Sequence, residues 1–400
     1  MTLEWSLLLQ QLKALVRRAD WTLVLAATGL AILGILFIWG GSFQSEPTEW
    51  GLFRASALRQ SLWLVVGLTA MTLALLLPYR YLAHYGYTLY VLAVGALLYL
   101  AAGAFVHRWG GPTLPLAPEI RHAHRWIDLG SVTIQPAEFA KIAFIIALAK
   151  YVRYKESYRR WWGLLPPFAL AAVPMLLVAL EPDLGSALVF APVTFALLYV
   201  AGAQKRHLLL YAAAPLAAGV LLWLLGIQLL APYQHDRLLA FLDPERYARG
   251  PGYQVLQSLI AVGSGGLWGK GLGQGTQGQL GFLPARGTDF IFASIAEEWG
   301  FAGATAVLAL YVYLLVGAAT IARRTRDPFG RLLAVGVLTL VATQALINTA
   351  MTVRLAPVTG LPLPFVSLGG SSLVANFIAL GILLNVGARP TAVLSREDFQ

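Results

Sequence analysis

An acidic residue at the start of a long apolar run is the strongest candidate for chemistry in this chain. Asp289 directly follows Gly287-Thr288 and precedes the apolar run 290–319. A carboxylate at such a position often only complements the positive end of a helix dipole. If the run crosses a membrane, however, an ionisable group at its edge is a functional candidate, because it is costly to keep there without a use. From these residues alone the helix-dipole interpretation is the more common one.

Two further segments place polar residues where they could meet a ligand. Glu138 and Lys141 are spaced i, i+3 and fall on one helix face, which predicts an internal ion pair. At the edge of a cavity the same pair could position a phosphate or a sugar hydroxyl. Glu181 and Asp183 form a turn between two short apolar runs, and the segment 354–372 is interrupted by Pro and Gly. Such breaks at membrane depth are tolerated only where the backbone meets protein or a wet cavity, so a ligand-facing role competes with that of a re-entrant plug.

Two patterns favour structural roles instead. Glu297 and Glu298 lie two turns into the helix expected after Asp289, and we expect both to be paired inside the bundle, since an unpaired carboxylate there costs ~2.5–3.5 kcal/mol. The segment 265–271 looks like a phosphate-binding loop. Its spacing before Gly-Lys is too short and no Ser or Thr follows the Lys, so we do not expect it to bind a nucleotide.

The histidines give the chain one metal-binding pattern. His122 and His124 form His-x-His, and together with His107 and His235 they could bind zinc. Basic neighbours disfavour a cation there, so we expect no catalytic metal at these residues. The chain has no cysteine, which excludes disulfides and thiolate metal sites and leaves the redox compartment undetermined.

The composition places these residues in a membrane. The chain has 400 residues, 58% hydrophobic and 12% charged, and a mean hydropathy of +0.68, whereas soluble domains carry about 25% charged residues. We predict an all-α polytopic membrane protein with about ten transmembrane helices in one bundle, since about 20 apolar residues cross a bilayer. The expected spans are 21–41, 61–77, 86–106, 137–152, 166–180, 184–202, 208–230, 290–319, 332–353 and 368–386.

The basic residues predict the orientation. Lys and Arg number 29 against 19 Asp and Glu, and most of them lie close to helix ends on the side of the N-terminus, which the positive-inside rule makes cytoplasmic. We therefore expect an interfacial segment 1–20, a membrane domain 21–388 and a cytoplasmic tail 389–400. A long extracytoplasmic loop, 231–288, separates helices seven and eight, and its many glycines predict turns in 250–287 rather than helix or strand.

Several ordered motifs together resemble those of the SEDS family of bacterial cell-wall polymerases. The matching stretches are 125–141, 181–186, 253–300 and 362–372, and the segment 275–284 is closer to the RodA branch than to the FtsW branch. The resemblance implies a peptidoglycan glycosyltransferase of the bacterial cytoplasmic membrane that polymerises lipid II at the outer face during cell elongation. Two positions depart from the family pattern. Gly287 stands where members commonly have His, and Leu368 stands where they have Tyr.

The resemblance also implies roles for individual residues. The acid that matches Asp289 is the catalytic one, and a single carboxylate can act as general base for an attacking sugar hydroxyl. The diphosphate leaving group needs Arg, Lys or a divalent cation, and assistance by Mg²⁺ or Mn²⁺ is implied although the sequence reveals no ligand set. The expected substrate-binding residues are Arg125, Glu138, Lys141, Glu181, Asp183, Lys270, Arg286, Arg354, Ser371 and Ser372.

The implied partners are a class B penicillin-binding protein, which is a transpeptidase, and the rest of the elongation complex. The implied ligands are lipid II, undecaprenyl-linked glycan and membrane lipids, so the positive charge indicates topology and an anionic lipid rather than nucleic acid. Two other functions stay open. A lipid II flippase or transporter would also show Pro/Gly-interrupted segments and buried carboxylates, but no inverted repeat is visible. A non-enzymatic scaffold of the cell-wall synthesis complex would need no acid at Asp289.

Overall fold

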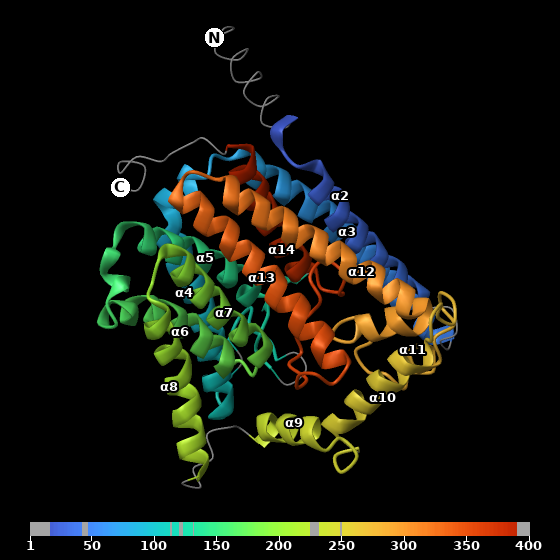
Figure 1. Cartoon of the computed structure of the whole chain (residues 1–400). Coiled ribbons are helices and arrows are strands. Elements are labelled where there is room, and N and C mark those ends of the chain that lie inside the picture. Colours follow the sequence, from blue (N-terminus) through green and yellow to red (C-terminus); the bar gives the residue numbers. More distant parts are fainter. Residues whose placement is uncertain are drawn as a thin grey trace.

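The computed structural model describes residues 17–41, 47–112, 114–119, 123–130, 132–224, 232–248 and 250–389. These residues form a helical bundle with one short strand pair (Figure 1). The longer helices are α2 (Trp21–Gly40), α3 (Pro47–Leu76), α4 (Arg80–Arg108), α5 (Pro136–Tyr154), α6 (Leu165–Leu180), α7 (Leu184–Ala201), α8 (Lys205–Leu224), α12 (Ile291–Arg324), α13 (Pro328–Thr352) and α14 (Gly370–Ala388).

The predicted all-α membrane architecture is confirmed. Eight of the described helices are long and apolar enough to cross a membrane, namely α2, α3, α4, α6, α7, α12, α13 and α14. The other two expected spans coincide with α5, which carries four charged side chains, and with α8, whose described part ends at Leu224. Residues 1–16 and 390–400, which hold most of the expected interfacial segment and tail, lie outside the described residues.

Two contacts between helix ends identify the two opposite ends of the bundle. Asn348, near the end of α13, donates to the backbone carbonyl of Asp289 just before α12, so we call this the Asp289 end. At the opposite end, Arg153 near the end of α5 forms an ion pair with Asp327. Asp327 is fully buried and also caps the start of α13 by accepting a hydrogen bond from the Gly330 N–H at 2.8 Å. This pair fixes α5 against α13 far from the candidate site.

The loop expected over 231–288 is partly helical, so the prediction of turns throughout 250–287 is wrong. The segment contains α9 (Pro232–Leu242), α10 (Pro251–Ser264) and the short α11 (Thr276–Gln279), which lie together along one side of the bundle in Figure 1. The glycines of α10 stand near its two ends, and its interior is an uninterrupted apolar and amide-rich run that can form helix. Turns occur between α10 and α11, where glycines are dense, and also at 244–248 and 284–290.

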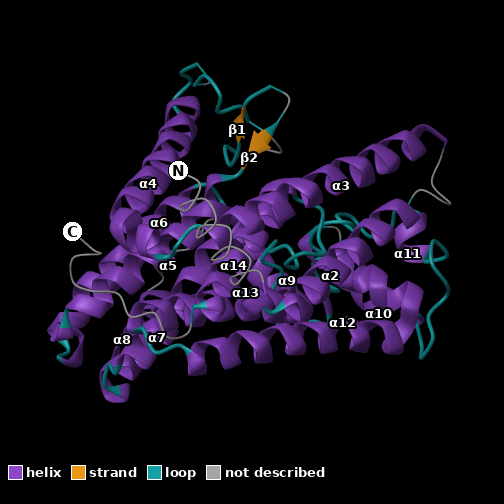
Figure 2. Ribbon diagram, turned by 90° about the horizontal axis from the view of Figure 1, so that it is seen from above, coloured by secondary structure: helices purple, strands orange, loops and turns teal. Residues whose placement is uncertain are grey.

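The strand pair consists of β1 (Ile127–Asp128) and β2 (Thr133–Ile134), which pair antiparallel with Ile127 opposite Ile134. Figure 2 shows this pair projecting from the bundle near the far end of α4. Its chain continues directly into α5, so the strands connect the loop after α4 to the Asp289 end of the bundle.

The helix α12 is broken at Gly300, whose backbone (φ 66°, ψ −163°) is not helical. The break is filled by the glycine-rich segment 265–273. Four backbone hydrogen bonds join the two, from the N–H groups of Phe301, Ala302, Lys270 and Gly271 to the carbonyls of Gly266 (2.8 Å), Leu267 (3.0 Å), Glu297 (3.1 Å) and Glu298 (2.9 Å). Backbone groups freed inside a membrane protein need such partners, so the break and the segment require each other.

The glycines of this segment serve close approach rather than phosphate binding. A Cβ atom at Gly265 or Gly269 would overlap the backbone carbonyls of Ala296 or Glu298 on α12. Close packing against α12 therefore accounts for glycines in the segment that looks like a phosphate-binding loop.

We predict that Gly300→Ala destabilises the protein by on the order of 3 kcal/mol or more, because this backbone conformation is essentially restricted to glycine. The added methyl would also lie 2.6 Å from the Leu267 carbonyl oxygen. Thermal unfolding in detergent would measure the loss. Gly29→Ala in α2 is the matched control, since nothing lies within 4 Å of its Cβ position, and it is expected to be neutral or stabilising by up to about 1 kcal/mol. Equal melting midpoints for the two variants would contradict the role of the break.

Candidate active site

Asp289 lies in the turn before α12 and is half-buried. The helix begins at Ile291 with Phe290 as its cap residue and without a side-chain cap. The Oδ2 atom of Asp289 and the Nη1 atom of Arg237 both lie within 4 Å of the position that a Cβ atom would occupy at Gly360. The carboxylate is thus directed towards the segment around Gly360 and the guanidinium on α9, rather than onto the helix terminus as the helix-dipole interpretation would require.

The backbone of the Asp289 turn is held from two sides. Asn348 of α13 donates to the Asp289 carbonyl at 2.8 Å and to the Leu361 carbonyl at 2.7 Å. From the other side, the Ser367 hydroxyl donates to the Thr288 carbonyl at 2.6 Å. Since Ser367 is itself bound by the buried Gln60 of α3 through its carbonyl (3.1 Å), the turn is positioned by two helices, α13 and α3, and by the segment 357–369.

A second polar cluster gathers four of the predicted residues. Arg125 donates to the backbone carbonyls of Glu181, at 2.7 Å, and Pro182. Asp183 caps α7 through the Ser186 N–H at 3.1 Å and accepts from the Gln135 side chain at 3.2 Å. The Gln135 N–H in turn donates to the Ser371 hydroxyl at 3.0 Å. The structure therefore brings Arg125, Glu181, Asp183 and Ser371 together, although they come from three segments.

The two clusters lie on opposite sides of one segment. Gly185, at the start of α7, approaches so closely that its Cβ atom would lie 2.8 Å from the carbonyl oxygen of Thr359 and from Leu361. Gly360, between these two residues, faces Asp289. The segment 357–369 is thus a shared wall between the Asp289 turn and the Arg125 cluster.

The predicted ion pair of Glu138 and Lys141 is confirmed. The Nζ and Oε1 atoms are 2.6 Å apart and both side chains are 2% exposed. Ser372 is less directly connected, because its hydroxyl and carbonyl accept from Asn376 one turn further along α14. Substrate binding by these three residues stays a prediction.

The three remaining predicted cations already have protein partners. Lys270 donates to Glu297 Oε1 at 2.7 Å. Arg354 donates to the Phe241 and Leu242 carbonyls at the end of α9. Arg286 donates to the carbonyls of Gly41, at 2.9 Å, and Gly278. Of the three, only Arg286 borders the cavity described next.

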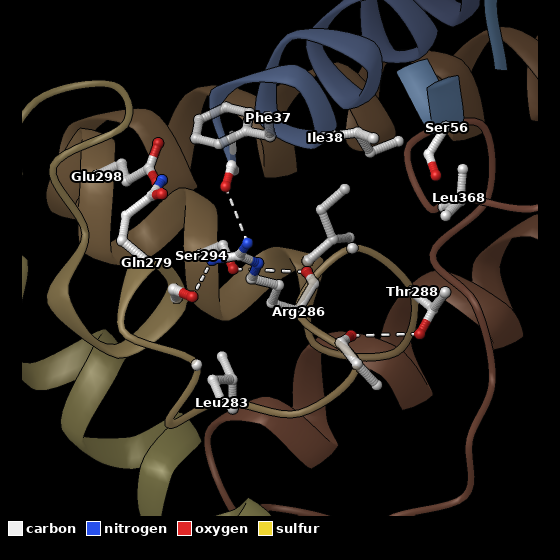
Figure 3. Close-up of a pocket in the computed structure, with 16 residues that line it drawn as sticks. Phe37, Ile38, Ser56, Gln279, Leu283, Arg286, Thr288, Ser294, Glu298 and Leu368 are labelled. Atoms are coloured by element: carbon white, nitrogen blue, oxygen red, sulfur yellow. Dashed lines mark hydrogen bonds between the residues drawn. The ribbon is translucent and has the colours of Figure 1, made fainter. Parts of the chain in front are cut away.

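A cavity of about 400 Å³ lies beside the Asp289 turn. Residues 285–288 form one wall, and the other walls come from α2, α3, α11 and α12. Figure 3 shows Arg286 reaching across it, with Glu298 at one end and Ser56 and Leu368 at the other. Asp289 does not border this cavity; the turn that precedes it does. The Glu298 carboxylate accepts from the Gly273 N–H at 2.9 Å, so both glutamates of α12 have partners, as expected from the sequence.

Comparisons with known proteins agree with this architecture. The family model described as "Cell cycle protein", which covers FtsW, RodA and SpoVE, matches residues 20–391. The chain belongs to the FtsW/RodA/SpoVE family. It is 35% identical to the peptidoglycan glycosyltransferase MrdB of Escherichia coli K12 over 92% of this chain and 93% of that one. It is 33% identical to the probable peptidoglycan glycosyltransferase FtsW of Geobacter metallireducens over 94% and 96% of the two chains.

A solved structure is also similar. It is described as "Structural coordination of polymerization and crosslinking by a peptidoglycan synthase complex", and its chain aligns with a TM-score of 0.75 at 33% identity, covering 93% of this chain and 98% of that one. Together with the curated relatives, this makes the chain a peptidoglycan glycosyltransferase of the FtsW/RodA/SpoVE family and a multi-pass membrane protein.

Several residues that position the Asp289 turn and the Arg125 cluster were not identified from the sequence. Asn348 and Gln60 were recognisable in principle, because a buried amide in an apolar run is costly unless it has partners. Gln135 directly precedes α5 and gave no separate signal. Arg237 was one of several cations in the segment 231–288, and only the folding of α9 brings it near Asp289.

Glu181 has an unusual environment within the Arg125 cluster. The side chain is 1% exposed and both carboxylate oxygens lack a hydrogen-bond partner. Burial raises the pKa of Glu181 to about 9; the nearby Asp183 carboxylate raises it further, and the Arg125 guanidinium opposes the shift. Without a bound cation, the group is thus mostly protonated at pH 7 in the folded protein.

This shift predicts a pH-dependent stability. Because the folded-state pKa is raised, the stabilisation by proton uptake is complete below the unfolded pKa near 4.5 and is lost as the pH rises towards 9. Glu181→Gln mimics the neutral acid. We expect it to increase the free energy of unfolding at pH 8 by on the order of a few kcal/mol, and so to raise the melting midpoint, and to have little effect near pH 5. The exposed Glu245→Gln is the control. A Glu181→Gln effect that is the same at both pH values would refute the assignment.

Proposed function

We propose that this glycosyltransferase polymerises lipid II into glycan strands at the outer face of the bacterial cytoplasmic membrane during cell elongation, with Asp289 as general base. The observation that supports this most is the direction of the Asp289 carboxylate. It lies outside α12, beside Gly360 and Arg237, in a turn whose preceding residues wall a cavity. A base held in this way can receive a proton from a bound hydroxyl without disturbing the helix.

The proposed reaction is a direct displacement. The acceptor sugar hydroxyl attacks the anomeric carbon of the donor, and the Asp289 carboxylate takes the hydroxyl proton. The new glycosidic C–O bond forms as the bond between the anomeric carbon and the diphosphate breaks. Undecaprenyl diphosphate leaves with the electron pair, and the configuration at the anomeric carbon inverts.

Cations near the turn suit the leaving group. Arg286 borders the cavity, and its guanidinium charge would attract a diphosphate bound there. A groove of about 370 Å³, lined by residues of α2 and α3 that include Trp39 and Arg54, lies on the same two helices as the cavity wall. We infer that the polyprenyl chain follows this groove into the membrane while the diphosphate reaches Arg286.

The orientation and the partner follow from charge and similarity. The end opposite Asp289 carries basic residues next to several helix ends, among them Arg80, Arg153, Lys205 and Arg324, which under the positive-inside rule places it in the cytoplasm. The Asp289 end is then extracytoplasmic. The similar peptidoglycan synthase complex, which couples polymerization to crosslinking, supports a class B penicillin-binding protein as partner of this chain.

A bound Mg²⁺ or Mn²⁺ ion would neutralise the diphosphate as charge develops. Among the described acids near the site, the Glu181 carboxylate has both oxygens without hydrogen-bond partners, and Asp183 lies next to it. Two carboxylates, one of which already caps α7, are too few ligands for Mg²⁺ unless substrate phosphates supply the others. Mg²⁺ is usually held in that way. Glu181 and Asp183 are thus the residues that would share such an ion.

Replacing the proposed base tests this function. We expect Asp289→Asn to lower the rate of glycan polymerisation from lipid II about 10²–10⁴-fold, the typical contribution of general base catalysis, while the melting midpoint changes little. The assay would follow glycan strands by gel electrophoresis, using the purified chain with its penicillin-binding partner. Asp20→Asn is the matched control, because Asp20 caps α2 at the opposite end and Asn caps equally well. Full polymerisation by Asp289→Ala would exclude Asp289 as the base.

A further inference from the structure

Three metal-binding side chains meet outside the active site, at the far end of α4. His107 is in the last turn of α4, and Glu119 and His124 come from the loop that follows. Their ligand atoms all lie within 4.8 Å of one another. The closest two, His107 Nε2 and Glu119 Oε2, are 3.1 Å apart. The residues converge on one point although the loop separates them in sequence.

His124 shows an arrangement typical of a metal ligand. The residue is 5% exposed, and its Nδ1 atom lies 2.9 Å from the Ala117 carbonyl oxygen. Because a carbonyl only accepts, Nδ1 carries the proton, which leaves the Nε2 lone pair of the neutral ring available. This Nε2 atom is buried and has no hydrogen-bond partner. An unsatisfied buried acceptor costs about 1–3 kcal/mol, whereas a metal-ligating His commonly donates its other ring N–H to a backbone carbonyl.

We propose that His107, Glu119 and His124 bind a divalent transition-metal ion, of which Zn²⁺ suits the donors best. Two imidazoles and a carboxylate are an established zinc ligand set, with a fourth position left for water. Mg²⁺ prefers oxygen ligands, so this site is chemically distinct from an ion bound through diphosphate. Ligand atoms around a tetrahedral ion with bonds of ~2.1 Å are roughly 3.4 Å apart, so the cluster would contract only slightly on binding.

Arg125, one of the basic neighbours that made a cation unfavourable in sequence reasoning, does not occupy the site. Arg125, the residue after His124, is directed to the carbonyls of Glu181 and Pro182. His122, the other histidine of His-x-His, lies outside the described residues. The third side chain of the cluster is Glu119, which the sequence pattern did not include. The chain thus directs this one charge away from the metal-binding side chains.

The consequence of binding is structural. The ion would fasten the loop after α4 to the helix end, and His124 directly precedes the residue that holds the turn at Glu181. Metal binding at the cluster would therefore restrict the loop and, through Arg125, fix the turn between α6 and α7. The site would stabilise part of the extracytoplasmic face without taking part in the reaction.

Zinc binding by the full-length protein without an affinity tag tests the proposal. The protein, freed of metal with a chelator in detergent, would be titrated with Zn²⁺ against a chromophoric competitor, and Co²⁺ would report a tetrahedral nitrogen and oxygen site by its absorption. We expect one ion per chain, affinity at least tenfold weaker in both His124→Gln and Glu119→Gln, and no competition from millimolar Mg²⁺. The control is His84→Gln, since His84 is exposed at the other end of α4; it should bind like the wild type.

Hydrogen exchange gives a second readout, because Zn²⁺ should protect amides of residues 109–130 in the wild type but not in Glu119→Gln. Glu119 is partly exposed, so this variant keeps the test valid if His124→Gln does not fold. Absence of stoichiometric binding by the wild type would overturn the proposal. So would equal affinity in wild type and Glu119→Gln, which would show that the ion binds elsewhere.

Discussion

The position of the site depends on one buried carboxylate, Glu297. Its side chain is fully buried and accepts hydrogen bonds from the Lys270 ammonium (2.7 Å), the Thr276 hydroxyl (3.1 Å) and the Gln277 N–H (3.0 Å). Because α12 is interrupted at Gly300, the part between Asp289 and the break is not continuous with the rest of the helix. The Glu297 network ties that part to the glycine-rich segment, and removal of the Lys270 charge would leave the buried Glu297 carboxylate without its counter-ion, at a cost of about 3–5 kcal/mol.

The same constraint, that backbone groups inside the bundle must find partners, explains the wall segment 357–369. This segment is not helical, so side chains provide hydrogen-bond partners for its backbone carbonyls and N–H groups. Asn348 serves Leu361, the Ser367 hydroxyl accepts from the Leu363 N–H at 2.8 Å, and Gln60 serves Ser367 and Gly369. These amides and hydroxyls carry no charge, so they fix an irregular backbone in an apolar bundle without the desolvation penalty of ions. The irregular wall is what lets Asp289 lie beside the backbone at Gly360.

Local features of the site could be predicted from the sequence, and distant ones could not. The ion pair of Glu138 and Lys141 follows from helix periodicity, because both residues belong to one helix. The apolar runs likewise gave the membrane helices. By contrast, Arg237 approaches Gly360 only because α9 forms in a segment that was expected to be a loop. The direction of Asp289 was equally unpredictable, since helix capping and catalysis place the same residue type at the same position. The cluster of His107, Glu119 and His124 was also not predictable as a set, because Glu119 comes close to His124 only in the folded chain.

The distribution of polar groups between the two ends also bears on transport as an alternative. A transporter needs a path through the bundle that opens to both sides, with its binding groups near the middle. Here the break in α12 is filled by backbone of the glycine-rich segment, and the carbonyls of Glu297 and Glu298 and the N–H groups of Phe301 and Ala302 are bound by it rather than open to a passing head group. At the opposite end, the buried pair of Arg153 and Asp327 joins α5 to α13, and opening there would expose or unpair a fully buried carboxylate. The polar groups proposed to bind the substrate lie instead around the wall segment at the Asp289 end. Asp289 lies on one face of the wall and Arg125, Asp183 and Ser371 lie on the other, so these groups gather at one end of the bundle rather than along a path through it.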